Sequence, residues 1–135
     1  MYEIQQEIVP IAHDDFFIIL NHYDAVFKYP IHCHPEYEIN VVMDTCGTRV
    51  IGDSQENFEG LDIVMMGPYL PHVWKAEGGG HRVVTIQFSG DLLKYQIINK
   101  RLFLPIKQLL VGSAQGLCFN GPEAERIRDE ILELT

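Results

Sequence analysis

The chain has 135 residues, of which 47% are hydrophobic and 21% charged, a composition that favours one globular domain with a buried core. Its net charge of −9 disfavours binding to a phosphate backbone, so DNA binding would need a basic segment outside this sequence. No apolar run approaches the ~18 residues of a membrane span, and the N-terminus lacks a signal-peptide pattern. With three cysteines and no export signal, we expect reduced thiols and a cytoplasmic location.

Short β-prone runs separated by turn residues dominate the first 90 residues. Asp44 to Gly47 predicts a hairpin, Gly52 to Asn57 a polar turn, and the three glycines at 78–80 a loop. Strands at this spacing, with turns between them, predict an antiparallel β-sandwich or barrel. The predicted strands cover residues 2–9, 16–20, 36–43, 48–51, 61–66, 72–74 and 82–88.

The pattern changes after Ser89, where short helices are predicted over 91–98 and 105–111 and one more strand over 116–119. A last helix is predicted to start near Pro122, because proline suits the first helical position. We therefore expect a β-rich ligand-binding core over 1–90 and a helical part over 91–135. The sequence stops at Thr135 without a helix C-cap, which predicts a cut inside a longer protein.

The last helix carries one apolar stripe, formed by Ile127, Ile131 and Leu134 at positions i, i+4 and i+7. Two interpretations are open for such a stripe. It can dock on the surface of its own domain, or it can form a seam between two copies of the chain.

The stretch "YPIHCHPEYEIN" carries the densest group of polar side chains in the sequence. Alternate residues of a strand share a face, so His32, His34, Glu36, Glu38 and Asn40 are predicted to line one side if no bulge intervenes. Imidazole and carboxylate groups are the usual ligands for Zn, Fe, Mn, Ni or Cu. A further ligand could come from another strand, and His72 is the candidate. Three interpretations remain open: a metal site, a pocket for a small polar molecule, or groups that only hydrogen-bond each other.

Three short motifs in chain order resemble the two-motif signature of the cupin superfamily, whose fold is a small antiparallel β-barrel. They are His32-x-His34-x-x-x-Glu38, Gly60-x-Asp62 and Pro68-x-x-Pro71-His72. The longer string from "HCHPEYEIN" to "GPYLPHVW", with "VVTIQFSGDLL" and "GLCFNG" after it, resembles the N-terminal sensor domain of AraC-family bacterial transcription regulators. This resemblance covers roughly residues 10–135 and implies a cupin-like β-barrel (jelly roll) followed by short C-terminal α-helices.

The resemblance implies a sensing and dimerisation domain and not an enzyme, with a small-molecule effector such as a sugar and a homodimer as the working form. DNA binding would reside in a C-terminal domain that this sequence lacks, and Ile127, Ile131 and Leu134 would form the dimer interface. No cofactor would be required. The expected ligand pocket consists of His32, His34, Glu36, Glu38, Asn40, Met66, His72 and Trp74.

The alternative is a metal-dependent cupin enzyme, an isomerase or a dioxygenase. In it, a divalent ion (Zn, Ni, Mn or Fe) would be held by His32, His34, Glu38 and His72. The sequence departs from the enzyme-type motifs, because Thr45 stands where a glycine is expected and Ala76 where an asparagine is expected. The ligand positions are thus retained while their enzyme-type surroundings are not, which weakens the case for catalysis more than the case for metal binding.

Overall fold

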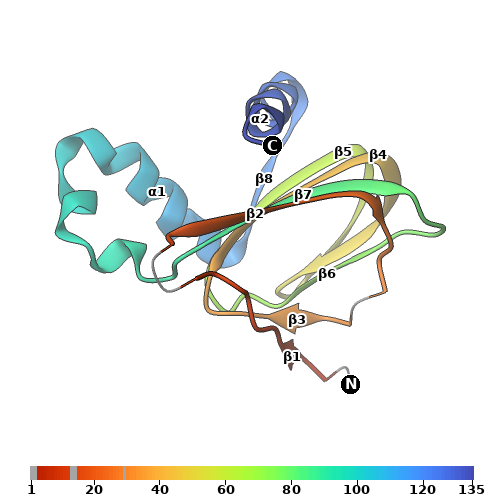
Figure 1. Ribbon diagram of the computed structural model, residues 1–135, viewed down its shortest axis with the longest axis horizontal. Coiled ribbons are helices and arrows are strands. Elements are labelled where there is room, and N and C mark those ends of the chain that lie inside the picture. Colours follow the sequence, from red (N-terminus) through yellow and green to blue (C-terminus); the bar gives the residue numbers. More distant parts are fainter. Residues whose placement is uncertain (1–2, 13–14, 29) are drawn as a thin grey trace.

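The computed structural model describes residues 3–12, 15–28 and 30–135 and is mainly β-structure, with short helices near the C-terminus (Figure 1). This confirms the predicted fold class at that level. The strands are β1 (Gln5–Gln6), β2 (Phe17–Ala25), β3 (His32–Cys33), β4 (Tyr37–Ile51), β5 (Ser54–Met66), β6 (His72–Lys75), β7 (His81–Phe88) and β8 (Leu117–Phe119). The helical segments are the 3-10 turns η1 (Leu92–Lys94), η2 (Gln96–Asn99), η3 (Arg101–Phe103) and η4 (Ser113–Gln115) and the α-helices α1 (Leu104–Gly112) and α2 (Gly121–Glu133).

The eight described strands belong to one sheet that folds over into two layers (Figure 1). One layer contains β2, β7, β4 and β5, and β8 from the helical part joins its edge by pairing with β5. The other layer contains β6, β3 and β1, and it pairs with the second half of β4. No pairing among the described strands joins the ends of the sheet, so the sheet is open and the cupin-like barrel stays a prediction.

The strand β4 runs through the segment where a hairpin was predicted, so that prediction is wrong. Asp44 has a φ of 58°, and the pairing with β5 shifts between Met43 and Thr45, which together mark a bulge. Aspartate tolerates this left-handed conformation, and the strand bends there without reversing. The actual hairpin between β4 and β5 turns at Gly52, whose φ is 59°. The bend lets the first half of β4 pair with β7 and the second half with β6.

Two strands are longer than predicted: β2 continues to Ala25, and β5 begins at Ser54, so most of the predicted polar turn from Gly52 to Asn57 is strand. Further differences lie toward the ends of the chain. The predicted strand over 2–9 is reduced to β1, and Tyr2 lies outside the described residues. The predicted helix over 91–98 is replaced by a series of 3-10 turns, while the helix over 105–111 and the strand over 116–119 are confirmed as α1 and β8. The helix α2 begins where Pro122 predicts it.

The helix α2 covers the outer face of the sheet (Figure 1). Ile131 is 7% exposed and packs with Val41, Ile63 and Val84, while Ile127 is partly buried against the same cluster. Two of the three residues expected at a dimer seam, Ile127 and Ile131, therefore contact their own sheet, while the dimer interface itself stays a prediction. An amphipathic helix beside an uncovered apolar sheet face lowers its free energy by docking there. Leu134, at the end of the stripe, is 64% exposed.

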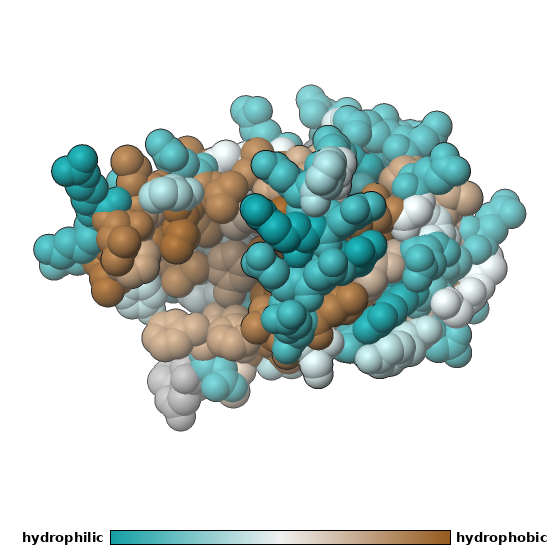
Figure 2. Space-filling view, turned by 90° about the horizontal axis from the view of Figure 1, so that it is seen from above, coloured by the Kyte–Doolittle hydropathy of each residue, from teal (hydrophilic) through white to brown (hydrophobic). Residues whose placement is uncertain are grey.

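An apolar surface lies over the helical segment between residues 97 and 111, where brown side chains gather on one side of Figure 2. Its most exposed members are Leu102, Ile97 and Val111, with Leu104, Ile106 and Leu109 beside them. The inner side of the same segment contributes Ile98 and Leu110 to a core cluster with Tyr37. Among the described residues, no helix has the length and apolar character needed to cross a membrane.

Replacing Ile131 by alanine is expected to lower the free energy of unfolding by about 2–4 kcal/mol, because the change leaves a cavity against the sheet. Leu134→Ala is the matched control on the same stripe, and its effect should stay within about 0.5 kcal/mol. Chemical denaturation followed by circular dichroism measures both. Equal losses in the two variants would contradict the packing of α2 described above.

Candidate functional site

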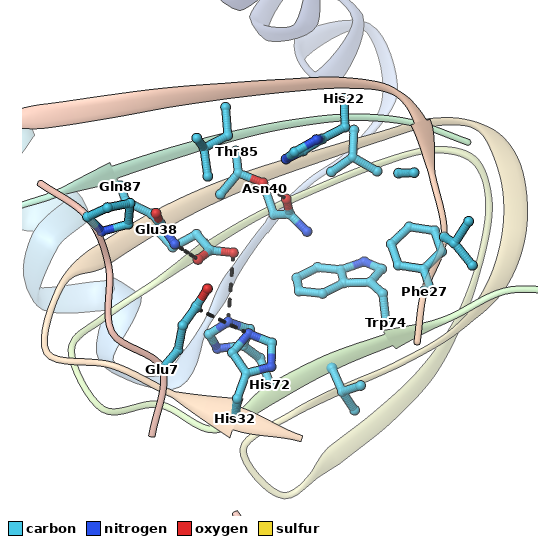
Figure 3. A pocket seen from close by; sticks show the side chains of 16 residues that line it. Glu7, His22, Phe27, His32, Glu38, Asn40, His72, Trp74, Thr85 and Gln87 are labelled. Atoms are coloured by element: carbon cyan, nitrogen blue, oxygen red, sulfur yellow. Dashed lines mark hydrogen bonds and ion pairs between the residues drawn. The ribbon is translucent and has the colours of Figure 1, made fainter. Parts of the chain in front are cut away.

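A cavity of about 370 Å³ lies between the two layers of the sheet (Figure 3). Apolar side chains form one part of its wall and polar side chains the other. The lining residues are Glu7, Pro10, Leu20, His22, Ala25, Val26, Phe27, His32, Glu38, Asn40, His72, Val73, Trp74, Val83, Thr85 and Gln87. This size and mixed lining are typical of sites for small molecules.

Three histidines and one glutamate converge at one end of this cavity. His32 on β3 is paired with His72 on β6, so the two rings lie side by side with centroids 4.4 Å apart. His34 follows β3, and Glu38 reaches the same place from β4 in the other layer. One ligand atom each from His34, Glu38 and His72 lies within 4.8 Å of the other two, and all three residues are buried. Three of the four residues predicted as metal ligands thus form one group, and the fourth, His32, lies beside it.

Backbone carbonyl groups fix the orientation of the imidazole rings. The Nδ1 atom of His34 lies 3.2 Å from the Glu36 carbonyl oxygen, and that of His72 lies 2.9 Å from the Leu70 carbonyl oxygen. Because a carbonyl oxygen only accepts hydrogen bonds, Nδ1 carries the proton in each ring, and Nε2 is the atom directed at the cluster. Histidines that bind a metal through one ring nitrogen usually donate a hydrogen bond from the other, as Nδ1 does here.

Glu38 is the electrostatic centre of the cluster. Its Oε2 atom lies 2.9 Å from His34 Nε2 and accepts a hydrogen bond of 2.9 Å from Gln87 Nε2, while Oε1 lies 3.7 Å from His72 Nε2. Burial by itself would raise the pKa of Glu38, but the hydrogen bond from His34 and the histidine charges outweigh it, so the pKa lies below its usual range. Burial likewise opposes protonation of His34, and its hydrogen bond with Glu38 raises the pKa above the usual value. Without a metal, the two residues therefore favour an ion pair.

The pKa of His72 is shifted in the opposite direction from that of His34. Burial lowers its pKa to about 4, although the charge of Glu38 acts against that shift. The ring is therefore neutral near pH 7 and presents a lone pair at Nε2. Within the described part of the chain, this atom is buried without a hydrogen-bond partner. A buried acceptor with no partner costs free energy, and a cation at the cluster would satisfy it.

The donor set fits a divalent metal ion. Two or three imidazole nitrogens with one carboxylate are the ligands that Zn, Ni, Mn and Fe share, and the orphaned Nε2 atom of His72 lies among them. His34, Glu38 and His72 would hold the ion, with His32 beside them. A divalent ion would replace the proton shared by His34 and Glu38 and could polarise an oxygen atom of a bound molecule.

The rest of the cavity wall combines an aromatic face with amide and hydroxyl groups. Trp74 is held by a hydrogen bond of 2.8 Å from its Nε1 atom to Asp62, and Asp62 in turn lies 2.9 Å from the Arg49 guanidinium. Asn40 accepts a hydrogen bond of 2.7 Å from Thr85 Oγ1, which fixes the amide and directs its NH₂ group toward the cavity (Figure 3). Burial raises the pKa of Asp62 above its usual range despite the hydrogen bond from Trp74.

Five of the eight residues predicted for the pocket line the cavity, namely His32, Glu38, Asn40, His72 and Trp74. His34 belongs to the cluster at its end. Glu36 and Met66 do not line the cavity, and the prediction is corrected for these two.

The reasons for the two corrections are local. The chain bends at Pro35 and Glu36 and β4 begins only at Tyr37, so the strand alternation does not extend to Glu36. Its Oε2 atom lies 3.5 Å from His34 Nδ1, on the side of the ring away from Glu38. Met66 is directly opposite Glu38 in the sheet but is fully buried in a cluster with Val42 and Val64.

Sequence reasoning missed several lining residues. Thr85 and Gln87 lie on β7, where the alternation of "RVVTIQF" already places them on one face with Val83, so this signal was present. Phe27 and Glu7 come from segments outside the long strands, and no local pattern indicates that they reach the cavity.

Comparison with known proteins gave no family model that matches the chain and no match among curated protein sequences.

Zinc is expected to bind at the cluster, and His72→Ala should weaken its affinity by a factor on the order of 10–100, because the variant removes a neutral buried ligand. Isothermal titration with Zn²⁺ on metal-free protein measures this. His22→Ala is the control, since His22 lines the same cavity away from the cluster (Figure 3) and its loss should leave the zinc affinity unchanged. Unaltered binding by the His72 variant would exclude the cluster as the zinc site.

Proposed function

We propose that this chain is the small-molecule-sensing and dimerisation domain of an AraC-family bacterial transcription regulator that acts in the cytoplasm. The observation that carries the proposal is the cavity of about 370 Å³ with a mixed apolar and polar wall. The resemblance of residues 10–135 to such sensor domains supports it, as does the folded-over sheet, which is compatible with a cupin-like barrel. Operator binding would reside in a domain outside these residues, because a net charge of −9 repels DNA.

The lining favours a neutral polar effector such as a sugar. Among the described residues that line the cavity there is no lysine or arginine, so an organic anion would find no permanently charged side chain on its wall. Hydroxyl groups could donate to Gln87 Oε1, a buried oxygen that lacks a hydrogen-bond partner within the described residues, and could accept from the Asn40 amide. The indole of Trp74 supplies an apolar face for the C–H groups of a sugar ring.

The effector would act by shifting a population. If it binds one arrangement of the homodimer more tightly than another, its binding free energy favours that arrangement and so changes how an attached domain engages DNA. Ile131 is buried against the sheet, so the part of the α2 stripe left for a dimer contact is the exposed Leu134 and the partly buried Ile127. No cofactor is required by this scheme, and a divalent ion at His34, Glu38 and His72 would be an additional contact for an effector oxygen.

The second candidate function is a metal-dependent cupin enzyme, an isomerase or dioxygenase, and the ligand set of the cluster favours it. In that case the ion would polarise a substrate oxygen, and Glu38 would be both ligand and hydrogen-bond acceptor. The two proposals differ in one observable. A sensor releases its effector unchanged, whereas an enzyme converts it.

Binding of monosaccharides and polyols tests the proposal directly. Trp74 is the single tryptophan and lines the cavity, so its fluorescence should change with a saturable dose response for at least one compound of such a panel. Asn40→Ala should weaken that binding about tenfold, because it removes a fixed donor in the cavity.

Asn57→Ala on the exposed part of β5 is the matched control and should bind as the unaltered protein does. Analysis of the recovered compound by mass spectrometry and NMR completes the test. Conversion of the compound in the presence of metal would favour the enzyme, and equal loss in both asparagine variants would remove the cavity as the binding site.

A further inference from the structure

The N-terminal segment lies along the open edge of the second layer and brings one carboxylate to the cluster. The strand β1 pairs in parallel with β3, so that Gln5 is opposite His32. Two backbone hydrogen bonds fix the segment, from the Gln5 amide to the Ile31 carbonyl at 3.1 Å and from the Glu7 amide to the Cys33 carbonyl at 2.8 Å. Glu7 therefore follows β1 at the level of the histidines.

The side chain of Glu7 is directed into the cluster (Figure 3). Its Oε2 atom lies 3.7 Å from His32 Nε2 and 3.8 Å from His34 Nε2. These separations are too long for hydrogen bonds. They approach the roughly 3.3 Å expected between two ligand atoms that share one tetrahedral zinc ion with bonds of about 2.0–2.1 Å. Glu7 lies outside the group formed by His34, Glu38 and His72, so its side chain, which is 42% exposed, would have to turn further into the cluster to share an ion with all three.

We propose that Glu7 is a further ligand of the metal ion held by His34, Glu38 and His72, so that the ion fastens the N-terminal segment to the sheet. Charge supports this assignment. Neutral histidines with Glu38 alone would leave a divalent ion with one uncompensated positive charge in a largely buried place, and the Glu7 carboxylate balances it. The inference rests on the metal-binding prediction for the cluster and is independent of whether the chain is a regulator or an enzyme.

A simpler explanation is an ordinary surface contact. The Glu7 side chain is 42% exposed, and an exposed pair of this kind contributes little to stability. Under that explanation, loss of the carboxylate would leave zinc affinity unchanged, and zinc would not alter the mobility of the segment. The two explanations therefore make opposite predictions for the same variant.

The test compares the unaltered chain, Glu7→Gln and Glu3→Gln in titrations with Zn²⁺. Glu3 is exposed on the same segment, so its variant removes the same charge without touching the cluster. We expect Glu7→Gln to bind zinc at least about tenfold more weakly, and Glu3→Gln to bind it as the unaltered chain does. Equal affinities in all three proteins, or equal losses in both variants, would overturn the proposal.

Hydrogen exchange read by mass spectrometry gives a second result that is independent of affinity. Saturating Zn²⁺ should slow exchange at residues 5–9 in the unaltered chain and in Glu3→Gln, but not in Glu7→Gln. Protection that persists in Glu7→Gln would overturn the role of this carboxylate. The variant His72→Ala shows which proposal fails. If this variant binds zinc with normal affinity, the cluster is not the zinc site. If His72→Ala loses affinity and Glu7→Gln does not, the cluster is the site and only the role of Glu7 is refuted.

Discussion

The bend in β4 is the constraint on which the rest of the structure depends. One strand passes through both layers, and this is possible only if its backbone can come very close to β6. Gly47 allows that approach, because a Cβ atom there would collide with the carbonyl group of Lys75. The bulge at Asp44 supplies the change of direction just before it. Glu38 on the first half of the strand is thereby placed opposite His72 on the strand that pairs with the second half.

This folding-over gathers polar groups from distant parts of the chain into a buried space, where each needs a partner. Glu38 finds His34 and Gln87, and Asp62 finds Arg49 and Trp74. Such buried charges are tolerated because they are paired and hydrogen-bonded, and each group helps to fix the position of the next. The Nε2 atom of His72 is the exception in the cluster, within the described residues. Structural pairing alone does not account for it, whereas a bound cation or ligand would.

Local patterns predicted the elements and most of the site. Alternation and residue type predicted where most of the strands lie, the start of α2 at Pro122, and the group of His34, Glu38 and His72. The segment from Asp44 to Gly47 forms a bulge and not the predicted hairpin, because aspartate and glycine favour both structures. The 3-10 turns after Ser89 have apolar residues at helical spacing, and only tertiary packing decides between the two helix types.

The features that the sequence did not predict depend on contacts between segments that are distant in the chain. Nothing near Glu7 indicates that a two-residue parallel strand brings it to the histidines. The stripe on α2 has the same spacing whether it meets its own sheet or a second copy, and only the fold shows that Ile131 is used internally. The closed barrel, the effector and the homodimer stay predictions.

The apolar surface between residues 97 and 111 has a consequence for how the chain behaves in solution. Side chains such as Leu102, which is 82% exposed, would associate between molecules if nothing kept the molecules apart. The net charge of −9 supplies a long-range repulsion that opposes this association near neutral pH. The repulsion vanishes near the isoelectric point of about 5.0 and is screened by salt. The tendency of the chain to associate therefore depends on the pH and salt concentration of the buffer as well as on the fold.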